Sequence, residues 1–212
     1  MEKIIYILIL ILLENDFYKD ISTLYSPTSY DILINKNNKL TSDYVPDDLE
    51  TISLEYSCQN KYLRHDAKIA FENMAKKARE EGLNIIAVST YRPYDYQEKL
   101  YNNYVKDKGF YYADLASARP GHSEHQTGLA VDVADLTLDY DNFEDTKEFT
   151  WMMNNSYKYG FILRYPKAKF DITGFKYEPW HYRYVGVDIA TYIYENNITL
   201  EEYYLIKDKV QL

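Results

Sequence analysis

The sequence has little of what a disulfide-stabilised or nucleic-acid-binding protein needs. Cys58 is the single cysteine, so no disulfide can form within the chain, and a cysteine-rich structural zinc site is disfavoured. There are 24 lysines and arginines against 33 aspartates and glutamates, which gives a net charge of −9. No basic stripe is present that would neutralise nucleic-acid phosphates. The sequence also has no internal repeat, low-complexity tract or glycine-rich phosphate loop.

Long apolar runs are missing as well, and the one apolar run of note lies at the N-terminus. Residues 4–13 are too few for a comfortable membrane span but fit the core of a signal peptide. Only Lys3 and the terminal amine precede this run as positive charges, and no clean A-x-A cleavage site follows. We expect residues 1–29 to be an export signal or membrane anchor followed by a linker. A buried strand or helix, or a truncated start, is the alternative.

Residues 30–212 are expected to form one α+β domain. Apolar residues at helical spacing predict helices over 66–81, 94–108, 145–159 and 187–196. Thr199 and Glu202 predict a capping box for a last short helix. Strands are predicted over 83–89, 128–136, 161–165 and 175–185. Strands and helices intermix without strict alternation, which is typical of the α+β class.

Two segments together supply the side chains of a catalytic zinc site. The first contains His125 and Asp132, and the second contains Glu178 and His181. Two histidines and one carboxylate leave a tetrahedral zinc with an open position, whereas structural zinc is normally closed by four protein ligands. We therefore predict zinc bound by these histidines and Asp132, with one carboxylate to spare.

The predicted strand over 128–136 suits this role. Alternation places Gly128, Ala130 and Asp132 on one face, and the two small residues leave space beside the carboxylate for a metal and a substrate. The opposite face is apolar and is expected to enter the core. His125 comes just before the strand, where a turn would aim its imidazole at the same point.

Glu178 is the candidate general base, because it is not needed to complete the metal shell. A carboxylate beside a metal can take a proton from water and pass it to a leaving amine. Pro179 cannot donate to a strand ladder, so we expect a bulge or an edge position there. Such an irregularity would let Glu178 and His181 converge although they are three residues apart.

The motifs, taken together, resemble a known family. Residues 123–132 match S-x-H-x-x-G-x-A-x-D at every specified position, residues 178–181 match E-x-x-H, and residues 89–97 match S-x-Y-R-x-x-x-x-Q. These patterns are those of the VanY-type zinc D-Ala-D-Ala carboxypeptidases, a branch of the LAS peptidases that shares its zinc fold with the hedgehog signalling domain. Residues 33–46 are also similar to the first segment of these domains. The resemblance runs from about Tyr30 to about Gly186.

The resemblance implies a hedgehog-like and DD-peptidase-like zinc fold, with a central, mainly antiparallel sheet flanked by helices. It implies one zinc ion on the three predicted ligands and Glu178 as the base. Arg92 would stabilise the oxyanion of the tetrahedral intermediate, which suits a fixed guanidinium. Ser123 and Gln97 would hold the terminal carboxylate of the substrate. The alternatives are an arginine that only caps a strand end and a glutamine that faces water.

The implied activity is removal of the C-terminal D-alanine from peptidoglycan stem peptides by a zinc metallocarboxypeptidase. The alternatives are an L,D-carboxypeptidase that acts on tetrapeptide stems, a dipeptidase or endopeptidase, and a non-catalytic hedgehog-like module that binds zinc. A module that only binds needs neither Glu178 nor Arg92, so their presence favours an enzyme. We expect a monomer at the bacterial cell wall, secreted or held at the membrane by residues 1–29, with a cytoplasmic location as the alternative.

Overall fold

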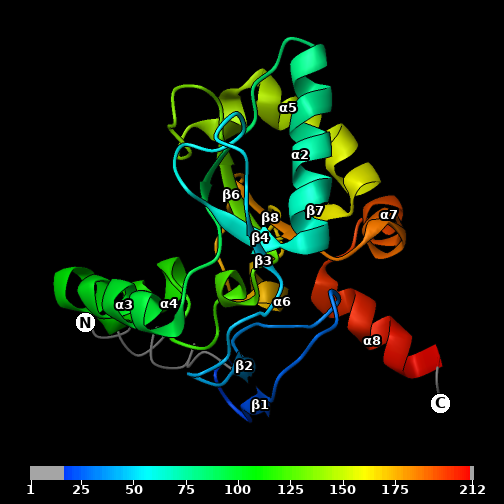
Figure 1. Ribbon diagram of the computed structural model, residues 1–212. Coiled ribbons are helices and arrows are strands. Elements are labelled where there is room, and N and C mark those ends of the chain that lie inside the picture. The colour runs from blue at the N-terminus through cyan, green and yellow to red at the C-terminus, as the bar shows by residue number, and fades with distance from the viewer. Residues whose placement is uncertain (1–16, 211–212) are drawn as a thin grey trace, which may run out of the picture.

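A four-stranded sheet lies at the centre of the computed structural model, which describes residues 17–210 (Figure 1). The strands follow the order β5 (Ile86–Ser89), β6 (Ala130–Ala134), β8 (His181–Tyr184) and β7 (Phe161–Leu163). Each neighbouring pair is antiparallel. Helices flank this sheet, so the predicted α+β class with a mainly antiparallel sheet is confirmed.

Helix α2 (His65–Glu80) supplies much of the core beside this sheet. Phe71 of α2 meets Phe161 of β7 edge to face, with ring centroids 6.2 Å apart. Burying an aromatic or aliphatic side chain of this size stabilises a fold by about 1.5–3 kcal/mol. The buried side of the helix has the spacing that the sequence predicted, and it consists of Ala67, Phe71, Met74, Ala75 and Ala78.

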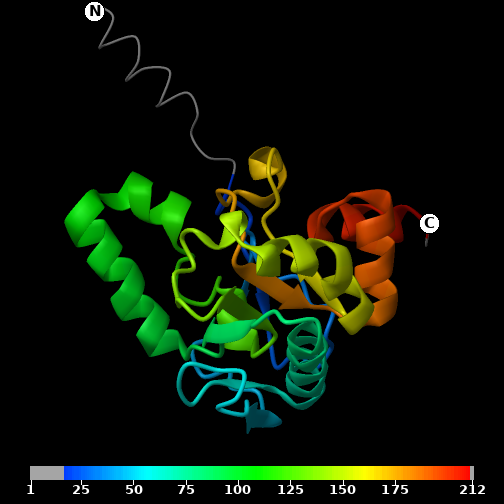
Figure 2. The same cartoon turned by 90° about the horizontal axis from the view of Figure 1, so that it is seen from above.

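Two helix pairs extend from opposite sides of the molecule. Helices α3 (Tyr94–Lys108) and α4 (Phe110–Ala116) form a hairpin on one side, and α7 (Val187–Asn196) and α8 (Leu200–Val210) lie on the other (Figure 2). The bounds of α3 and α7 are those predicted, whereas α4 was not predicted. The predicted capping box of α8 is present, since Thr199 N donates to Glu202 Oε2 (2.8 Å) and Glu202 N donates to Thr199 Oγ1 (3.2 Å).

The predicted helix over 145–159 consists of two pieces. Helix α5 (Lys147–Asn155) is followed by the 3-10 helix η3 (Ser156–Tyr159), and Gly160 ends it with a φ of 82°. Trp151 is buried, whereas Met153 is 38% exposed. Three short helical turns complete the fold: η1 (Glu124–Thr127), η2 (Phe143–Asp145) and α6 (Phe170–Thr173).

The N-terminal part of the described chain adds two small sheets. Strand β1 (Ser22–Leu24) pairs in parallel with β2 (Asn38–Leu40), and β3 (Leu49–Thr51) pairs antiparallel with β4 (Tyr62–Arg64).

Residues 17–29, the described part of the predicted linker, lie against the domain. The carbonyl of Pro27 accepts a hydrogen bond from Tyr44 Oη (2.9 Å), and that of Thr28 accepts one from Arg64 Nη1 (2.8 Å). The apolar run that we predicted to be a signal or anchor lies outside the described residues, and the boundary at residue 30 stays a prediction. Between residues 17 and 210 no helix is both long enough and apolar enough to cross a membrane.

The predicted strand over 128–136 is shorter at both ends than expected. Gly128 is not part of it, because this residue ends η1 in the left-handed conformation, with a φ of 67°. This positive φ favours glycine, whereas space does not demand it, because the nearest atom that a Cβ added there would meet is the movable end of a side chain, Leu49 Cδ2, at 2.8 Å. From Ala130 onward the predicted alternation holds, and Val131 and Val133 are fully buried in the core.

Candidate metal centre and active site

The three predicted metal ligands meet at the centre of the sheet. Asp132 and His181 are direct cross-strand partners on β6 and β8, and such partners have Cβ atoms about 5 Å apart. Asp132 Oδ1 lies 2.9 Å from His181 Nδ1, and Asp132 Oδ2 lies 3.3 Å from His125 Nε2. One ligand atom from each residue lies within 4.8 Å of the others. The fold therefore brings together two nitrogens and a carboxylate oxygen.

Each imidazole is held through the nitrogen that does not face Asp132. His125 Nδ1 lies 2.7 Å from the carbonyl of Thr90, so this nitrogen must carry the proton, and the buried Nε2 has no hydrogen-bond partner among residues 17–210. His181 Nε2 lies 3.3 Å from Glu124 Oε2, which leaves Nδ1 to face Asp132. Metal-binding histidines typically donate their other N–H to a carbonyl or carboxylate in this way. The residues therefore fit Zn²⁺ with an open coordination position.

The electrostatics of the cluster also favour a cation. Burial lowers the pKa of His125 to about 4, with a further contribution from Arg92, so this ring is neutral at pH 7. Burial also disfavours the charged form of His181, but hydrogen bonds to Asp132 and Glu124 outweigh it and raise the pKa to about 9. A site that stabilises a proton so strongly between carboxylates also stabilises a divalent cation, which displaces that proton on binding.

Glu178 reaches the ligands through a turn, and the predicted bulge or edge position is wrong. Of the predicted strand over 175–185 only β8 is formed, and it lies between β6 and β7. Pro179 occupies a turn that is closed by His181 N donating to the Glu178 carbonyl (3.2 Å). Proline suits a turn because its φ is already fixed near the required value.

This turn places the Glu178 carboxylate beside the metal site. Its Oε2 lies 3.9 Å from His181 Nδ1. Burial raises the pKa of Glu178 to about 7, which is close to the pH at which a general base works best. The geometry and the acidity therefore both suit the predicted role.

Arg92 lies directly after β5 and faces the same site. Its backbone N donates to the carbonyl of His125 (3.1 Å), which ties the arginine to the ligand-bearing segment. The Arg92 side chain lines the pocket that contains the predicted ligands. A guanidinium beside a metal site is suited to bind an anionic oxygen of a substrate.

The two predicted carboxylate-binding residues are placed differently. Ser123 is buried and lines the active-site pocket. Gln97 is only 1% exposed, so it does not face water, but it lies behind the pocket wall. Its Nε2 donates to Ser117 Oγ (3.0 Å) and to the Ala118 carbonyl (2.8 Å), and both of these residues line the pocket. The role of Gln97 in binding a carboxylate stays a prediction.

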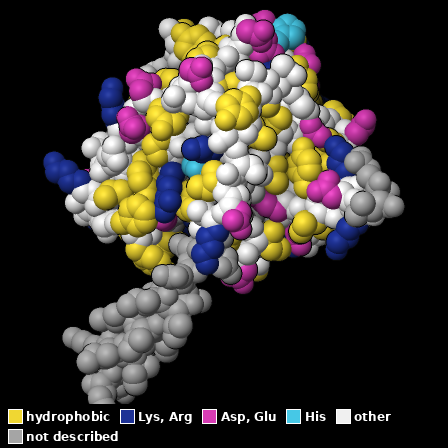
Figure 3. Space-filling view, turned by 90° about the horizontal axis from the view of Figure 1, so that it is seen from below, with side chains coloured by type: hydrophobic (Ala, Val, Ile, Leu, Met, Phe, Trp, Pro, Cys, Tyr) yellow, Lys and Arg dark blue, Asp and Glu magenta, His cyan; other side chains and the backbone are white. Residues whose placement is uncertain are grey.

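The pocket over the ligands has a volume of about 470 Å³. Figure 3 shows a hollow on this face in which one histidine is visible between basic and hydrophobic side chains. The α3–α4 hairpin supplies one wall and the segments around β6 and β8 supply the other. The outer parts of these walls include Tyr96, Leu100, Tyr104, Tyr140, Lys176 and Trp180.

Nothing in the sequence indicates the buried charge pairs behind the predicted ligands. Glu124, to which no role was given, has a fully buried side chain whose Oε1 lies 2.7 Å from both Arg164 Nε and Arg183 Nη1. Burial raises the pKa of Glu124, but the two guanidiniums outweigh this and hold it well below its usual range. The one local feature that could have indicated the burial of Glu124 is its position inside the S-x-H motif, between Ser123 and His125.

The two remaining histidines lie outside the ligand cluster. His122 is buried, with its Nδ1 2.9 Å from the Asn35 carbonyl. His65 begins α2 and is exposed, with its Nδ1 2.6 Å from Glu50 Oε1.

Comparisons with known proteins indicate the family of this chain. The family model described as VanY, D-alanyl-D-alanine carboxypeptidase, matches residues 60–187. The chain is 42% identical to the putative carboxypeptidase YodJ of Bacillus subtilis (strain 168), over 91% of this chain and 75% of the relative.

Two solved structures extend the likeness to the fold and to the metal. The LdcB LD-carboxypeptidase shares 41% sequence identity with a TM-score of 0.80, over 88% of this chain and 90% of that one. A mutant of the vancomycin resistance D,D-pentapeptidase VanY, solved in complex with Zn(II), shares 36% identity with a TM-score of 0.70, over 82% and 98%. The predicted resemblance is confirmed: the chain belongs to the VanY family and is a zinc-dependent carboxypeptidase.

Proposed function

We propose that this protein removes the terminal D-alanine from the pentapeptide stems of peptidoglycan. The observation that carries the proposal is the convergence of four groups on one pocket: the His125–Asp132–His181 cluster, the Glu178 carboxyl, the Arg92 guanidinium and Ser123. The family model bears the description D-alanyl-D-alanine carboxypeptidase, which supports the same substrate.

His125, Asp132 and His181 would hold the zinc ion. When bound, zinc lowers the pKa of water from about 15.7 to about 7 and polarises a carbonyl oxygen. The chain supplies the proton chemistry. Glu178 accepts the proton of the attacking water as the new C–O bond forms, and it then passes this proton to the nitrogen of D-alanine as the C–N bond breaks.

Arg92 and Ser123 orient the substrate and stabilise charge. As water adds, the carbonyl oxygen gains negative charge, and the Arg92 guanidinium, which lines the pocket, would donate hydrogen bonds to it. The Ser123 hydroxyl lines the same pocket and would bind the terminal carboxylate. Recognition of that carboxylate restricts cleavage to the end of the peptide.

The likeness to an LD-carboxypeptidase, with a TM-score of 0.80, favours a second candidate, in which D-alanine is removed from tetrapeptide stems. The same residues perform the same steps in both reactions. The two candidates differ in the residue before the scissile bond, which is D-alanine in a pentapeptide and the L-configured centre of the third residue in a tetrapeptide. The choice therefore depends on the pocket walls beyond the metal.

The test is to give the zinc-loaded full chain muropeptides with pentapeptide and tetrapeptide stems in separate reactions and to weigh the products by mass spectrometry. Loss of one alanine from the pentapeptide alone is the expected result. Loss from the tetrapeptide alone would replace the proposal with the second candidate. If the chain binds one zinc ion but cuts neither stem, both candidates are wrong. Glu178→Gln protein, loaded with zinc, is the matched control.

The inferred substrate supports a location outside the cytoplasmic membrane, secreted or membrane-anchored. A tag at the C-terminus should be digested by protease added to intact cells stripped of their wall, and protection of the tag would place the protein in the cytoplasm. We also propose that the chain acts as a monomer, and a mass near 25.2 kDa by light scattering is expected.

A further inference from the structure

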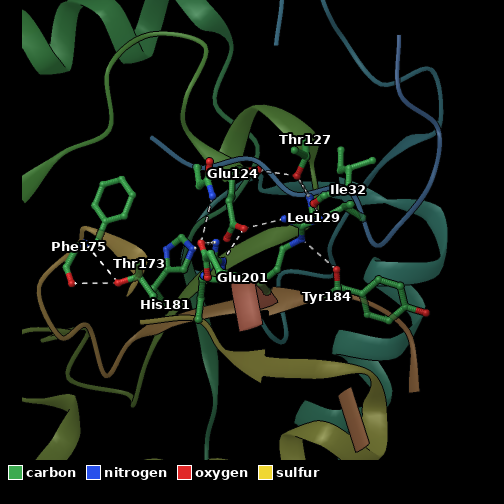
Figure 4. A network of polar contacts seen from close by, with 12 residues as sticks. Ile32, Glu124, Thr127, Leu129, Thr173, Phe175, His181, Tyr184 and Glu201 are labelled. Carbon is green, nitrogen blue, oxygen red and sulfur yellow. Dashed lines mark hydrogen bonds and ion pairs between the residues drawn. The ribbon is translucent and has the colours of Figure 1, made fainter. Parts of the chain in front are cut away.

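The Glu124 carboxylate lies behind the zinc ligands and has no access to solvent. Its two oxygens have different partners: Oε2 lies 3.3 Å from His181 Nε2, and Oε1 accepts hydrogen bonds from Arg164 Nε and Arg183 Nη1, each at 2.7 Å. Figure 4 shows Glu124 beside His181 within this network of contacts. One carboxylate thus connects a metal ligand to two fully buried cations.

The two arginines are themselves fixed by other parts of the fold. Arg164 also donates to both carboxylate oxygens of Glu201 on α8, at 2.8 and 2.6 Å. Arg183 donates through Nη2 to the carbonyls of Ile32 (2.7 Å) and Tyr30 (3.0 Å). Paired guanidiniums of this kind present their donors in a rigid plane, so the position of the Glu124 carboxylate is set from several sides.

The orientation of His181 follows from this arrangement. An ionised carboxylate only accepts hydrogen bonds, so His181 donates its Nε2–H to Glu124. Nδ1 then faces Asp132 in the direction of the metal site, and the proton between these two atoms is the one that a metal ion would displace. His125 has only the neutral carbonyl of Thr90 in the equivalent place. A carboxylate that accepts the N–H of an imidazole makes this imidazole a stronger metal ligand than a neutral carbonyl does.

We propose that Glu124 is a positioning residue for zinc, which fixes the tautomer and the direction of His181, and that Arg164 and Arg183 hold Glu124 in place for this task. The inference rests on the assignment of the zinc site. It does not depend on which stem peptide is cut, so it is tested by metal binding and not by activity.

The first experiment compares Glu124→Gln with Glu201→Gln. Both variants remove one negative charge from the contacts of Arg164, but only the first removes a partner of His181. Loss of such a partner typically weakens metal binding by about 10–100-fold. We expect that loss for Glu124→Gln, measured by competition with a chromophoric zinc chelator, and an affinity near that of the parent for Glu201→Gln. Cobalt in place of zinc should give an altered visible spectrum only in Glu124→Gln.

Parent affinity in Glu124→Gln, or an equal loss in both variants, would overturn the proposal, because the network would then act on stability alone. The second experiment needs no variant and covers the case in which Glu124→Gln does not fold. Nitrogen-15 NMR of histidine-labelled, zinc-loaded parent protein should show His181 with a protonated Nε2 and a metal-bound Nδ1. The reverse assignment would contradict the proposed role.

Discussion

Two buried carboxylates lie on opposite sides of the active-site pocket, and their surroundings differ. Glu124 lies behind the central sheet residues, and Asp114 lies in the α3–α4 hairpin. The Glu124 side chain and its arginine partners are 0% exposed, and Glu124 contacts a metal ligand. Asp114 of α4 accepts hydrogen bonds from Tyr101 Oη (2.7 Å) and from Arg119 Nη2 (2.8 Å), and the Arg119 side chain is 30% exposed.

This difference in burial suggests a division of roles: the side of the pocket near Glu124 carries out the chemistry, and the side near Asp114 selects the substrate. Two of the predicted ligands, Asp132 and His181, lie on paired central strands, and the buried Glu124 carboxylate behind them is shielded from water. The α3–α4 hairpin is anchored by an ion pair that solvent partly screens, and it supplies one wall of the pocket. We therefore expect substitutions on the sheet side to lower kcat by orders of magnitude, and substitutions in the hairpin to act mainly on KM and stability.

Glu178→Gln should give the largest effect, because the amide keeps the shape of the side chain but cannot accept the proton. A general base contributes about 10²–10⁴-fold, so kcat should fall by that factor. Zinc content, measured by elemental mass spectrometry, should stay at one ion per chain. A variant with more than a tenth of the parent kcat would show that another group takes the proton.

Arg92→Ala tests the other chemical group on this side. Loss of one donor to a developing oxyanion costs about 10²–10³-fold in kcat. Arg92→Lys keeps the charge but loses the planar fork, so it should recover only part of the rate. Steady-state kinetics that show a raised KM with unchanged kcat in Arg92→Ala would assign this residue to binding only.

The pH profile tests the state of Glu178 in the intact enzyme. Burial raises its pKa to about 7, and only the ionised form accepts a proton, so the rate is lost as the pH falls through this pKa. A bound cation favours the ionised form of Glu178, so it moves the acidic side of the pH–rate profile to lower pH. We expect kcat/KM to fall about tenfold per pH unit below a midpoint at or under pH 7. A midpoint clearly above 7 would exclude Glu178 as the titrating base.

The sequence predicted the features that depend on neighbouring residues. Helices α3 and α7 have the predicted bounds because glycines, Gly109 and Gly186, mark one end of each. The ligands His125 and Asp132 were found because a short motif holds both of them. At Pro179 a bulge or an edge position was predicted, but the structure has a turn. Proline suits all three, and the edge position is excluded only by the pairing of β8 with two neighbouring strands.

The parts that the sequence did not predict depend on contacts between distant residues. Glu124 and Arg183 are 59 positions apart, and no local pattern indicates that both are buried and paired. Gln97 was predicted to touch substrate or water. The segment that covers it, Ser117 and Ala118, follows helix α4, which the sequence analysis did not predict. Which polar side chains are buried depends on the whole fold, so it could not be predicted from the sequence. The spacing of residues within a motif is visible in the sequence itself.

Asp114→Asn breaks the partly exposed anchor of the hairpin. Hydrogen bonds to a charged group contribute about 1.5–3 kcal/mol, so the free energy of unfolding should fall by about that amount in chemical denaturation. KM should rise more than kcat falls, because α4 forms the pocket wall and not the metal site. Asp95→Asn, on the exposed surface of α3, is the matched control and should change neither quantity. A large loss of kcat in Asp114→Asn would remove the distinction between the two sides.

Thr199→Ala should have the smallest effect and tests how far α8 supports the sheet side. Loss of an N-cap hydroxyl costs about 1 kcal/mol, and Thr199→Ser, which keeps the hydroxyl, should lose less. The cap adjoins Glu201, whose carboxylate pairs with Arg164. If Arg164 and Arg183 suffice to hold Glu124, then Thr199→Ala should lower the melting temperature slightly and leave zinc affinity and kcat unchanged. A fall in zinc affinity would mean that the rigid side extends to the C-terminal helix, and that the metal site depends on the buried contact between Glu201 and Arg164.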